Sequence, residues 1–275
     1  MRIRISHSIS YAYAEPARQI TQILRLTPRD HDGQHVMSWR IEPTIDGRIR
    51  AGQDPFGNLT HTFSADGPIS SLAIQVSGLI ETTDLAGIVR GGLERVPPEV
   101  FHRDTLLTTP DEALRGFAEE ATSSSDSDLS RMHALMDALH AEMTCHPTGK
   151  RSGVGAAAAF AAREGIAQDV AHVFITCARH LGLPARYVSG YVAQSDALPH
   201  ASGAHAWAEA YLADYGWIGF DCANGLCPID THIRVAAGLD YADAAPVRGA
   251  RKGGDGENLA VLVSARQADG RTANQ

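Results

Sequence analysis

The spacing of apolar residues changes once along this chain, from every second residue to every third or fourth residue. In the N-terminal part apolar and polar residues alternate, first from Arg2 to Tyr13 and again from His35 to Ile45. Clusters of Gly, Pro, Asn and Asp, such as Asp54 to Asn58, separate the alternating runs. Alternation interrupted by turn residues predicts an antiparallel sheet or sandwich. Helical spacing begins near residue 109, so the order of the two patterns predicts an α+β fold.

Three segments in the second part of the chain have the marks of helices. Thr109-Pro110-Asp111-Glu112 offers a capping residue, a proline at the first helical position and a glutamate three residues after the cap. A second helix is indicated by apolar residues on one face, which are Leu129, Met132, Leu135, Met136, Leu139 and Met143. A third, between Gly165 and Gly182, has Val170, Val173, Phe174, Cys177, Ala178 and Leu181. We therefore expect residue 167 to lie at the N-terminus of a buried helix.

Strand-like segments follow the third helix. They cover residues 185–194, 204–213 and 217–221, and one more covers 259–263 near the C-terminus. We expect the last of these to return to one of the sheets, and the polar residues after it to form a mobile tail.

The overall charge and the cysteine content exclude several classes of protein. The chain has 24 Lys and Arg against 32 Asp and Glu, a net charge of −8, whereas a protein that binds a phosphate backbone needs a basic surface. No run approaches the roughly 18 apolar residues of a membrane span, and the alternating N-terminus has no signal core. The four cysteines are too few and too unevenly spaced for a disulfide framework. We therefore expect a cytoplasmic protein with reduced thiols that binds neither nucleic acid nor a membrane.

The start of the third helix, one histidine and one aspartate together suggest the chemistry of a thiol amidase. A cysteine at a helix N-terminus has a lowered pKa, a histidine takes and returns its proton, and a carboxylate orients that histidine. The sequence supplies the helix start at 165–170, a histidine in His205-Ala206-Trp207-Ala208-Glu209, and an aspartate at Asp221.

Four segments resemble the bacterial transglutaminase-like superfamily. In order and approximate spacing they are similar to the Cys, His and Asp boxes of that family: Gly165 to His172, Gly182 to Tyr191, His205 to Glu209 and Gly216 to Gly225. The turn Phe56-Gly57-Asn58 and the segment Asp240 to Gly249 are also similar. The resemblance implies a β-rich transglutaminase-like N-terminal domain over residues 1–95 and a papain-like transglutaminase core over 105–245. A C-terminal strand and mobile tail would occupy 246–275.

The resemblance also implies an activity, which is acyl transfer from an amide. A thioester forms on a cysteine and is resolved by water, in a protease or amidase, or by an amine, in a transglutaminase; both outcomes stay open. The implied catalytic positions are residue 167 as the nucleophile, His205 as the base and Asp221 as the partner of the histidine. The residues expected to bind the substrate or the oxyanion are Gln168, Asp169 and Trp207. The expected partner is a peptide or amide substrate, with no cofactor and no metal.

The chain departs from the family at the nucleophile. Ala167 occupies the position of the cysteine, although Gln168, Asp169 and His172 around it still match. Because a methyl group cannot attack a carbonyl, we expect this chain to be inactive as an amidase. Either the cysteine was replaced deliberately, or the chain is a natural pseudoenzyme that acts as a peptide-binding module. The codon for residue 167 in the native gene separates these two interpretations.

Other residues near the boxes have expected roles of a different kind. We expect His172 to be a structural hydrogen-bonding residue, and Arg186 and Glu209 to form a buried pair. A metal-dependent hydrolase is a third, weaker class. The candidate ligands for zinc would be Cys222, Cys227, His200, His205 and His232, whose number and spacing fit a structural zinc site poorly.

Two expectations concern the shape of the site. If the turn at Asp214 to Gly216 is tight, Asp221 lies opposite about residue 209, four residues past His205. A bulge, a longer connection or strong twist would then be needed to bring Asp221 to His205. The loops at 145–155 and 195–203 are expected to border the substrate groove, because binding residues concentrate on loops held by a rigid scaffold.

Overall fold

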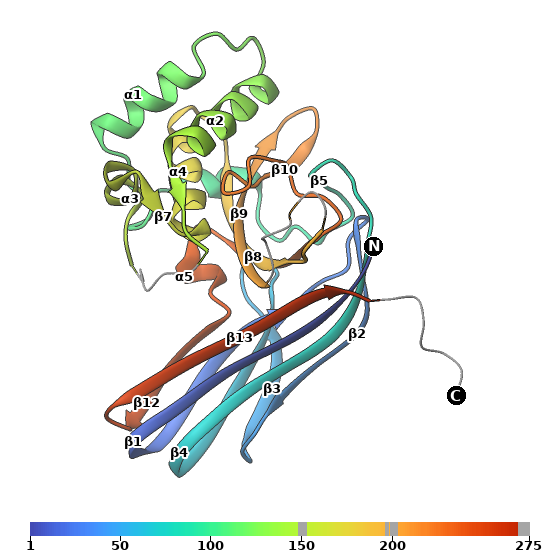
Figure 1. Ribbon diagram of the computed structural model, residues 1–275, viewed down its shortest axis with the longest axis vertical. Coiled ribbons are helices and arrows are strands. Elements are labelled where there is room, and N and C mark those ends of the chain that lie inside the picture. Colours follow the sequence, from blue (N-terminus) through green and yellow to red (C-terminus); the bar gives the residue numbers. More distant parts are fainter. Residues whose placement is uncertain (148–152, 196–197, 199–202, 269–275) are drawn as a thin grey trace.

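The computed structural model describes residues 1–147, 153–195, 198 and 203–268, and these residues form two large β-sheets and a group of helices. Figure 1 shows the first sheet at the bottom of the molecule and the second sheet above it, with the helices on the second sheet. The architecture confirms the predicted α+β class. None of the helices in these ranges is long and apolar enough to cross a membrane.

A long strand, β1 (Arg2–Thr27), organises the first sheet. One edge of β1 pairs antiparallel with β4 (Leu59–Thr82), and the other edge pairs with β13 (Glu257–Gln267) and then with β12 (Val247–Gly253). The strands on the far side of β4 are β2 (Gln34–Pro43) and β3 (Arg48–Gln53). Side chains point alternately to the two faces of a strand. Every second side chain of β1 from Ile3 to Ile9 is buried, so these residues face the core.

The C-terminal segment contributes two strands to the first sheet, where the sequence indicated one. The predicted strand at 259–263 lies within β13 and returns to a sheet, as expected. Strand β12 was not predicted, because its sequence VRGARKG has no apolar alternation and all of its residues after Val247 are exposed. Its backbone pairing with β1 makes it a strand, so tertiary context decides its conformation. Residues 269–275, within the predicted tail, lie outside the described residues.

The second sheet has five antiparallel strands. In spatial order they are β11 (His232–Gly238), β8 (Ala185–Val192), β9 (Gly203–Leu212), β10 (Gly216–Phe220) and β5 (Ile88–Val89). Strands β8, β9 and β10 correspond to the predicted segments, whereas β11 and the short β5 were not predicted. A separate parallel pair consists of β6 (Thr144–Cys145) and β7 (Glu164–Gly165).

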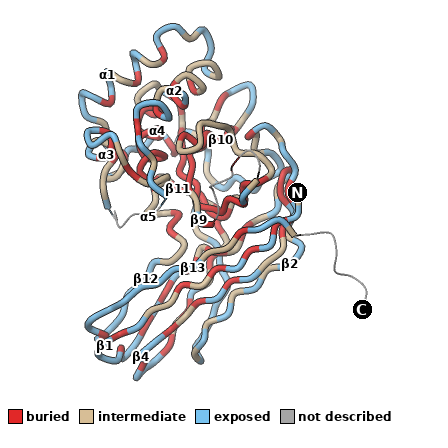
Figure 2. Tube along the Cα trace, viewed as in Figure 1, coloured by how far each residue is buried: buried red, intermediate tan, exposed pale blue. Residues whose placement is uncertain are grey.

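The helices pack on one face of the second sheet and enclose the main hydrophobic core. They are α1 (Glu112–Ala121), α2 (Asp128–Glu142), α3 (Ala156–Ala162), α4 (Ala167–His180) and α5 (Tyr241–Ala244), whereas Phe101 of the short helix η1 (Pro98–His102) packs against Trp217. Helix α4 is buried without a break from Asp169 to Arg179. Its apolar side chains share a core with three alanines of β9, which are Ala206, Ala208 and Ala210. Because side chains alternate along a strand, Trp207 and Glu209, which lie between these alanines, point to the opposite face. Figure 2 shows the buried chain concentrated at α4 and β9.

The first long helix begins later than the sequence suggested. Its N-cap is Asp111, whose Oδ1 accepts a hydrogen bond from the Leu114 N–H at 2.9 Å. The expected cap, Thr109, instead donates its hydroxyl to the Thr105 carbonyl at 2.7 Å. A carboxylate accepts hydrogen bonds from the free N–H groups of a first turn more strongly than a hydroxyl does, and its negative charge interacts favourably with the helix dipole.

Two amide side chains of the first sheet region attach it to the edge of the second sheet. Asn58 donates to the Ala237 carbonyl at 2.7 Å and accepts from the Ala237 N–H at 2.8 Å. Gln34 makes the same pair of bonds with the backbone of Arg234, at 2.9 and 2.8 Å. Both amides therefore satisfy backbone groups of β11 that a neighbouring strand would otherwise pair. This contact explains the presence of an asparagine in the turn Phe56-Gly57-Asn58.

A buried carboxylate joins three strands on the face of the second sheet opposite the helices. Glu209 has no exposed surface and accepts from Arg186 at 2.6 Å and from Arg234 at 2.8 Å. Arg186 also binds Glu94 at 2.8 Å and lies over the ring of Trp217, 3.8 Å from its centroid. The predicted buried pair of Arg186 and Glu209 is confirmed and is extended by Arg234.

We predict that Glu209→Gln lowers the free energy of unfolding by about 3–5 kcal/mol, because it leaves two buried guanidinium groups without their common anion. The matched control is Glu94→Gln, which removes a partly exposed partner of the same Arg186 and should cost about 1 kcal/mol or less. Urea unfolding followed by tryptophan fluorescence measures both. Equal losses in the two variants would contradict the assignment.

The same carboxylate should make stability depend on pH in the acid range. Burial alone would raise the pKa of Glu209, but the charges and hydrogen bonds of Arg234 and Arg186 outweigh it and hold the pKa at about 2. A depressed pKa contributes stability above the unfolded value of about 4.3 and loses it as the pH falls toward the folded value. The difference in stability between the parent protein and Glu209→Gln should therefore shrink between about pH 4.5 and pH 2.

Candidate active site

The predicted nucleophile position lies at the first residue of helix α4. The strand β7 ends at Gly165, and α4 begins at Ala167, as the sequence indicated. Gly165 is required by close packing, since a Cβ there would lie 2.7 Å from the Cβ of Asp169. The Asp169 carboxylate accepts a hydrogen bond from the Ile166 N–H at 3.0 Å. Asp169 therefore caps the helix, which leaves the backbone N–H groups of the first turn near position 167.

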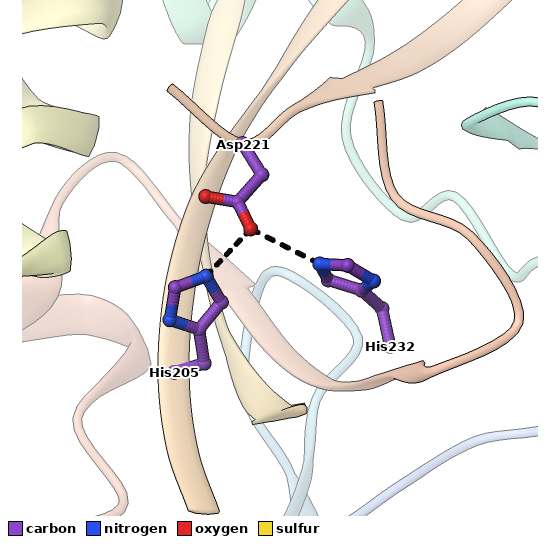
Figure 3. Close-up of side chains that lie close together, drawn as sticks. All are labelled: His205, Asp221 and His232. Atoms are coloured by element: carbon purple, nitrogen blue, oxygen red, sulfur yellow. Dashed lines mark hydrogen bonds and ion pairs between the residues drawn. The ribbon is translucent and has the colours of Figure 1, made fainter. Parts of the chain in front are cut away.

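His205 and Asp221 are in direct contact. Nε2 of His205 and Oδ2 of Asp221 are 2.7 Å apart, and Asp221 has no exposed surface (Figure 3). The expected contact is thus present, but the predicted register was wrong. Phe220 pairs with Ala208, so Asp221 falls beside Trp207, two residues from His205 and not four. A carboxylate at this diagonal position on the same face of the sheet can reach the imidazole without a bulge.

Asp221 accepts hydrogen bonds from three side chains through a single oxygen. Besides His205, Oδ2 lies 2.6 Å from Nδ2 of Asn224 and 3.0 Å from Nε2 of His232. The Asn224 N–H bonds Oδ1 at 3.3 Å. Burial alone would raise the pKa of Asp221, but the charge of His205 and the hydrogen bonds from both histidines hold it well below its usual range. The carboxylate is therefore ionised wherever the protein is folded at neutral pH.

Two of these partners were not identified as site residues from the sequence. His232 was considered only as a zinc ligand, and Asn224 only as part of a family segment. A loop of ten residues separates His232 from Asp221, so no periodic pattern links them. The isolated bridge between Asp221 and Leu226 folds this loop back on itself, which tertiary structure alone reveals.

Cys145 lies beside the start of helix α4. It pairs through β6 with Gly165, two residues before Ala167. The pKa of its thiol is raised to about 11, first by burial and then by the negative charges of Asp221 and Asp169. The backbone pairing places Cys145 beside the start of α4.

The residues expected to bind substrate have different surroundings. The amide nitrogen of Gln168 is buried and has no hydrogen-bond partner among the described residues, so it offers a free donor beside position 167. Trp207 is buried and packs against the rings of His205 and His232, with centroids 6.2 and 5.4 Å away. Nε2 of His172 accepts from the Tyr241 N–H at 3.0 Å, which gives that histidine the expected structural contact.

One group of described residues brings three metal-ligating side chains together. The ligand atoms of His205, Asp221 and His232 all lie within 4.8 Å of one another. The two cysteines of the zinc alternative are not in this group. The sulfur of Cys227 lies 3.6 Å from Nε2 of His133 instead. His200 of the same alternative, and residues 148–152, 196–197 and 199–202 of the two predicted groove loops, lie outside the described residues.

Comparisons with known proteins agree with this fold. The family described as the transglutaminase-like superfamily matches residues 115–222, and the bacterial transglutaminase-like N-terminal region matches residues 3–81. An uncharacterized protein of Mycobacterium leprae (ML0607) is 27% identical over 95% of this chain and 97% of its own length. An uncharacterized protein of Mycobacterium tuberculosis (Rv2569c) is 27% identical over 90% of this chain and 87% of its own length.

A solved structure shares the fold of the whole chain. It is that of a proposed cysteine protease from Cytophaga hutchinsonii, with a TM-score of 0.78 over 99% of this chain and 92% of that protein, at 20% sequence identity. A helix start, a His–Asp pair and this shared architecture define the class of a papain-like α+β protein. The chain belongs to the transglutaminase-like superfamily, a group of thiol-dependent acyltransferases and proteases.

We predict that the four native cysteines react slowly with iodoacetamide near neutral pH. Burial raises the pKa of Cys145 and of Cys227 to about 11 and that of Cys177 to about 12, and it raises the pKa of Cys222 well above its usual value. Little thiolate is therefore present, compared with a free cysteine of pKa about 8.5. Peptide mass spectrometry should find Cys145 and Cys227, which are partly exposed, labelled before the two buried thiols. Fast labelling of Cys177 in the folded protein would contradict this, and urea-unfolded protein gives the reference rate.

Proposed function

We propose that the chain has the active site of a thiol-dependent amide acyltransferase or amidase. In this site position 167 carries the nucleophile, His205 is the base and Asp221 orients the base. The observation that supports it most directly is the buried His205–Asp221 contact at 2.7 Å. A neutral histidine that donates from Nε2 to a carboxylate has Nδ1 free as a base. Figure 3 shows that Nδ1 of His205 points away from Asp221. We propose that it faces position 167.

With a thiol at position 167, the reaction would proceed in two steps. The thiol gives its proton to Nδ1 of His205, and the sulfur attacks the carbonyl carbon of an amide. Backbone N–H groups at the start of α4, and the unpaired donor of Gln168, would stabilise the oxyanion. The amine leaves with the proton from His205, and water or a second amine then resolves the thioester. No cofactor is needed for either step. The proposed substrates are peptides or other amides, in the cytoplasm, where the four free cysteines would stay reduced.

In the present chain the reaction cannot begin. Ala167 has neither a proton to transfer nor a lone pair for attack, so no thioester can form. What remains is a site with the base, its carboxylate and the helix N-terminus in place, and this combination can hold an amide without cleaving it. Ala167 itself thus favours a second candidate function, that of a pseudoenzyme that acts as a peptide-binding module.

We predict that Ala167→Cys restores a reactive thiol. The helix N-terminus and a protonated His205 both favour thiolate, so the new thiol should titrate well below about 8.5, the value of an unperturbed cysteine. The measurement is the rate of iodoacetamide alkylation against pH, with the four native cysteines as internal controls. Adding His205→Ala should raise the reactive pKa and abolish turnover of glutamine-containing peptides. Adding Asp221→Ala should reduce turnover less than removal of the thiol does.

A specific result of the same measurement would contradict the assignment of position 167. If the new thiol titrates like Cys145 and Cys227, and His205→Ala leaves its pKa unchanged, position 167 is not a nucleophile position. The peptide-binding module then replaces the enzyme as the proposed function.

A further inference from the structure

The contacts of His232 leave its ring a single role toward Asp221, which is that of a hydrogen-bond donor. Its side chain is 2% exposed, and its Nε2 lies 3.0 Å from Oδ2 of Asp221. On the other side of the ring, Nδ1 accepts a hydrogen bond from the Ile229 N–H at 3.3 Å and lies 3.2 Å from the Thr231 hydroxyl. Trp207 packs edge-on against the ring, with the planes at 90°. The imidazole is therefore held in place from three directions.

These contacts determine where the proton of His232 lies. A backbone N–H can only donate, so Nδ1 must present its lone pair to Ile229. In the neutral imidazole the hydrogen is then on Nε2, which donates to the carboxylate. A carboxylate can only accept, so this assignment satisfies both neighbours of the ring. The opposite tautomer would place a hydrogen against the Ile229 N–H and a lone pair against Asp221.

The same reasoning applies to His205 on the other side of the carboxylate. At 2.7 Å from Oδ2 of Asp221, its Nε2 must carry a hydrogen, since two lone pairs would repel at this distance. Oδ2 thus receives N–H groups from both histidines and from Asn224. With three donors around one oxygen, the carboxylate cannot rotate without leaving at least one donor unpaired in a buried place.

The proton assignment also decides against the other role that this cluster suggests. A metal ion bound by His205, Asp221 and His232 would need the lone pair of Nε2 on both rings. His232 would then carry its hydrogen on Nδ1, where the Thr231 hydroxyl can accept it but the Ile229 N–H loses its acceptor. The surroundings of His232 suit a hydrogen-bond donor and not a metal ligand.

We propose that His232 is a positioning residue, which holds Oδ2 of Asp221 where it accepts the Nε2–H of His205 and so keeps Nδ1 of His205 unprotonated as the base. The catalytic role of Nδ1 rests on the proposed function. The tautomer of His205 does not, because it can be measured without any reaction. It adds a residue on β11 to a site otherwise built from α4, β9 and the end of β10.

The test uses two variants that separate the ring nitrogens. His232→Gln places an amide N–H near the position of Nε2 and keeps a donor toward Asp221. His232→Asn places its amide near the position of Nδ1 and leaves Asp221 without that donor. Nitrogen-15 NMR of the histidine rings, on the full chain with Ala167 in place, reports the tautomer of His205. The ring of His172, which accepts from Tyr241 in another part of the core, serves as the control for an intact fold.

The expected result is that the parent protein and His232→Gln keep His205 in the Nε2–H tautomer, and that His232→Asn shifts it toward a mixture of both. An unchanged His205 tautomer in a folded His232→Asn protein would overturn the proposal. So would stoichiometric zinc binding to the parent protein that His232→Asn abolishes, because His232 would then be a ligand.

A kinetic arm applies if Ala167→Cys turns over a glutamine-containing peptide. In that background His232→Asn should lower kcat by about tenfold to a hundredfold, the effect of losing a buried hydrogen bond to a charged group. His232→Gln should stay close to the parent rate. If Ala167→Cys shows no turnover, the proposed function fails, while the NMR result still decides the role of His232. Equal rates in the Asn and Gln variants would overturn the positioning role.

Discussion

The structure depends on keeping two fully buried carboxylates of the second sheet region ionised. Glu209 and Asp221 both have no exposed surface. A buried carboxylate is tolerated only when its charge and its lone pairs are satisfied. Glu209 has two guanidinium partners, and Asp221 has two imidazoles and an amide. Removal of either set of donors would leave an anion that the surroundings cannot solvate.

This requirement explains how the two sheets fit together. The polar face needs a cover that excludes water, and part of that cover comes from the first sheet region and the connector after it. Gln34 and Asn58 attach to the backbone of β11, beside Arg234, and Glu94 of the connector completes the contacts of Arg186. On the other face, the apolar side chains of α4 pack against small alanines of β9. One sheet thus separates an apolar core from a charged one.

The candidate site lies where these two environments meet. The hydrogen bonds of Asp221 come from His205, His232 and Asn224, and none of them involves the side chain at position 167. The orientation of the histidine therefore does not depend on whether a cysteine or an alanine begins the helix. The cap formed by Asp169 and the close packing of Gly165 likewise involve only the backbone at the helix start. A site framework of this kind can persist without its nucleophile, which is why Ala167 is compatible with an intact fold.

Much of the fold could be predicted from local patterns, because alternation and helical spacing are read within one segment. The first half of strand β1, the buried helix α4 with residue 167 at its start, and the strands β8 to β10 follow from such patterns. Strands β11 and β12 escaped prediction, since pairing with β8 and β1 and not side-chain alternation determines them. The sequence by itself determined where the helix start lies, and the resemblance of its segments to a known family predicted that His205, Asp221 and this helix start belong to one site. Only the tertiary structure decided the register that brings Asp221 within 2.7 Å of His205, and the loop that returns His232 to the same oxygen. Contacts between distant residues leave no periodic signal, because a hydrogen bond depends on atoms meeting in space and not on spacing along the chain.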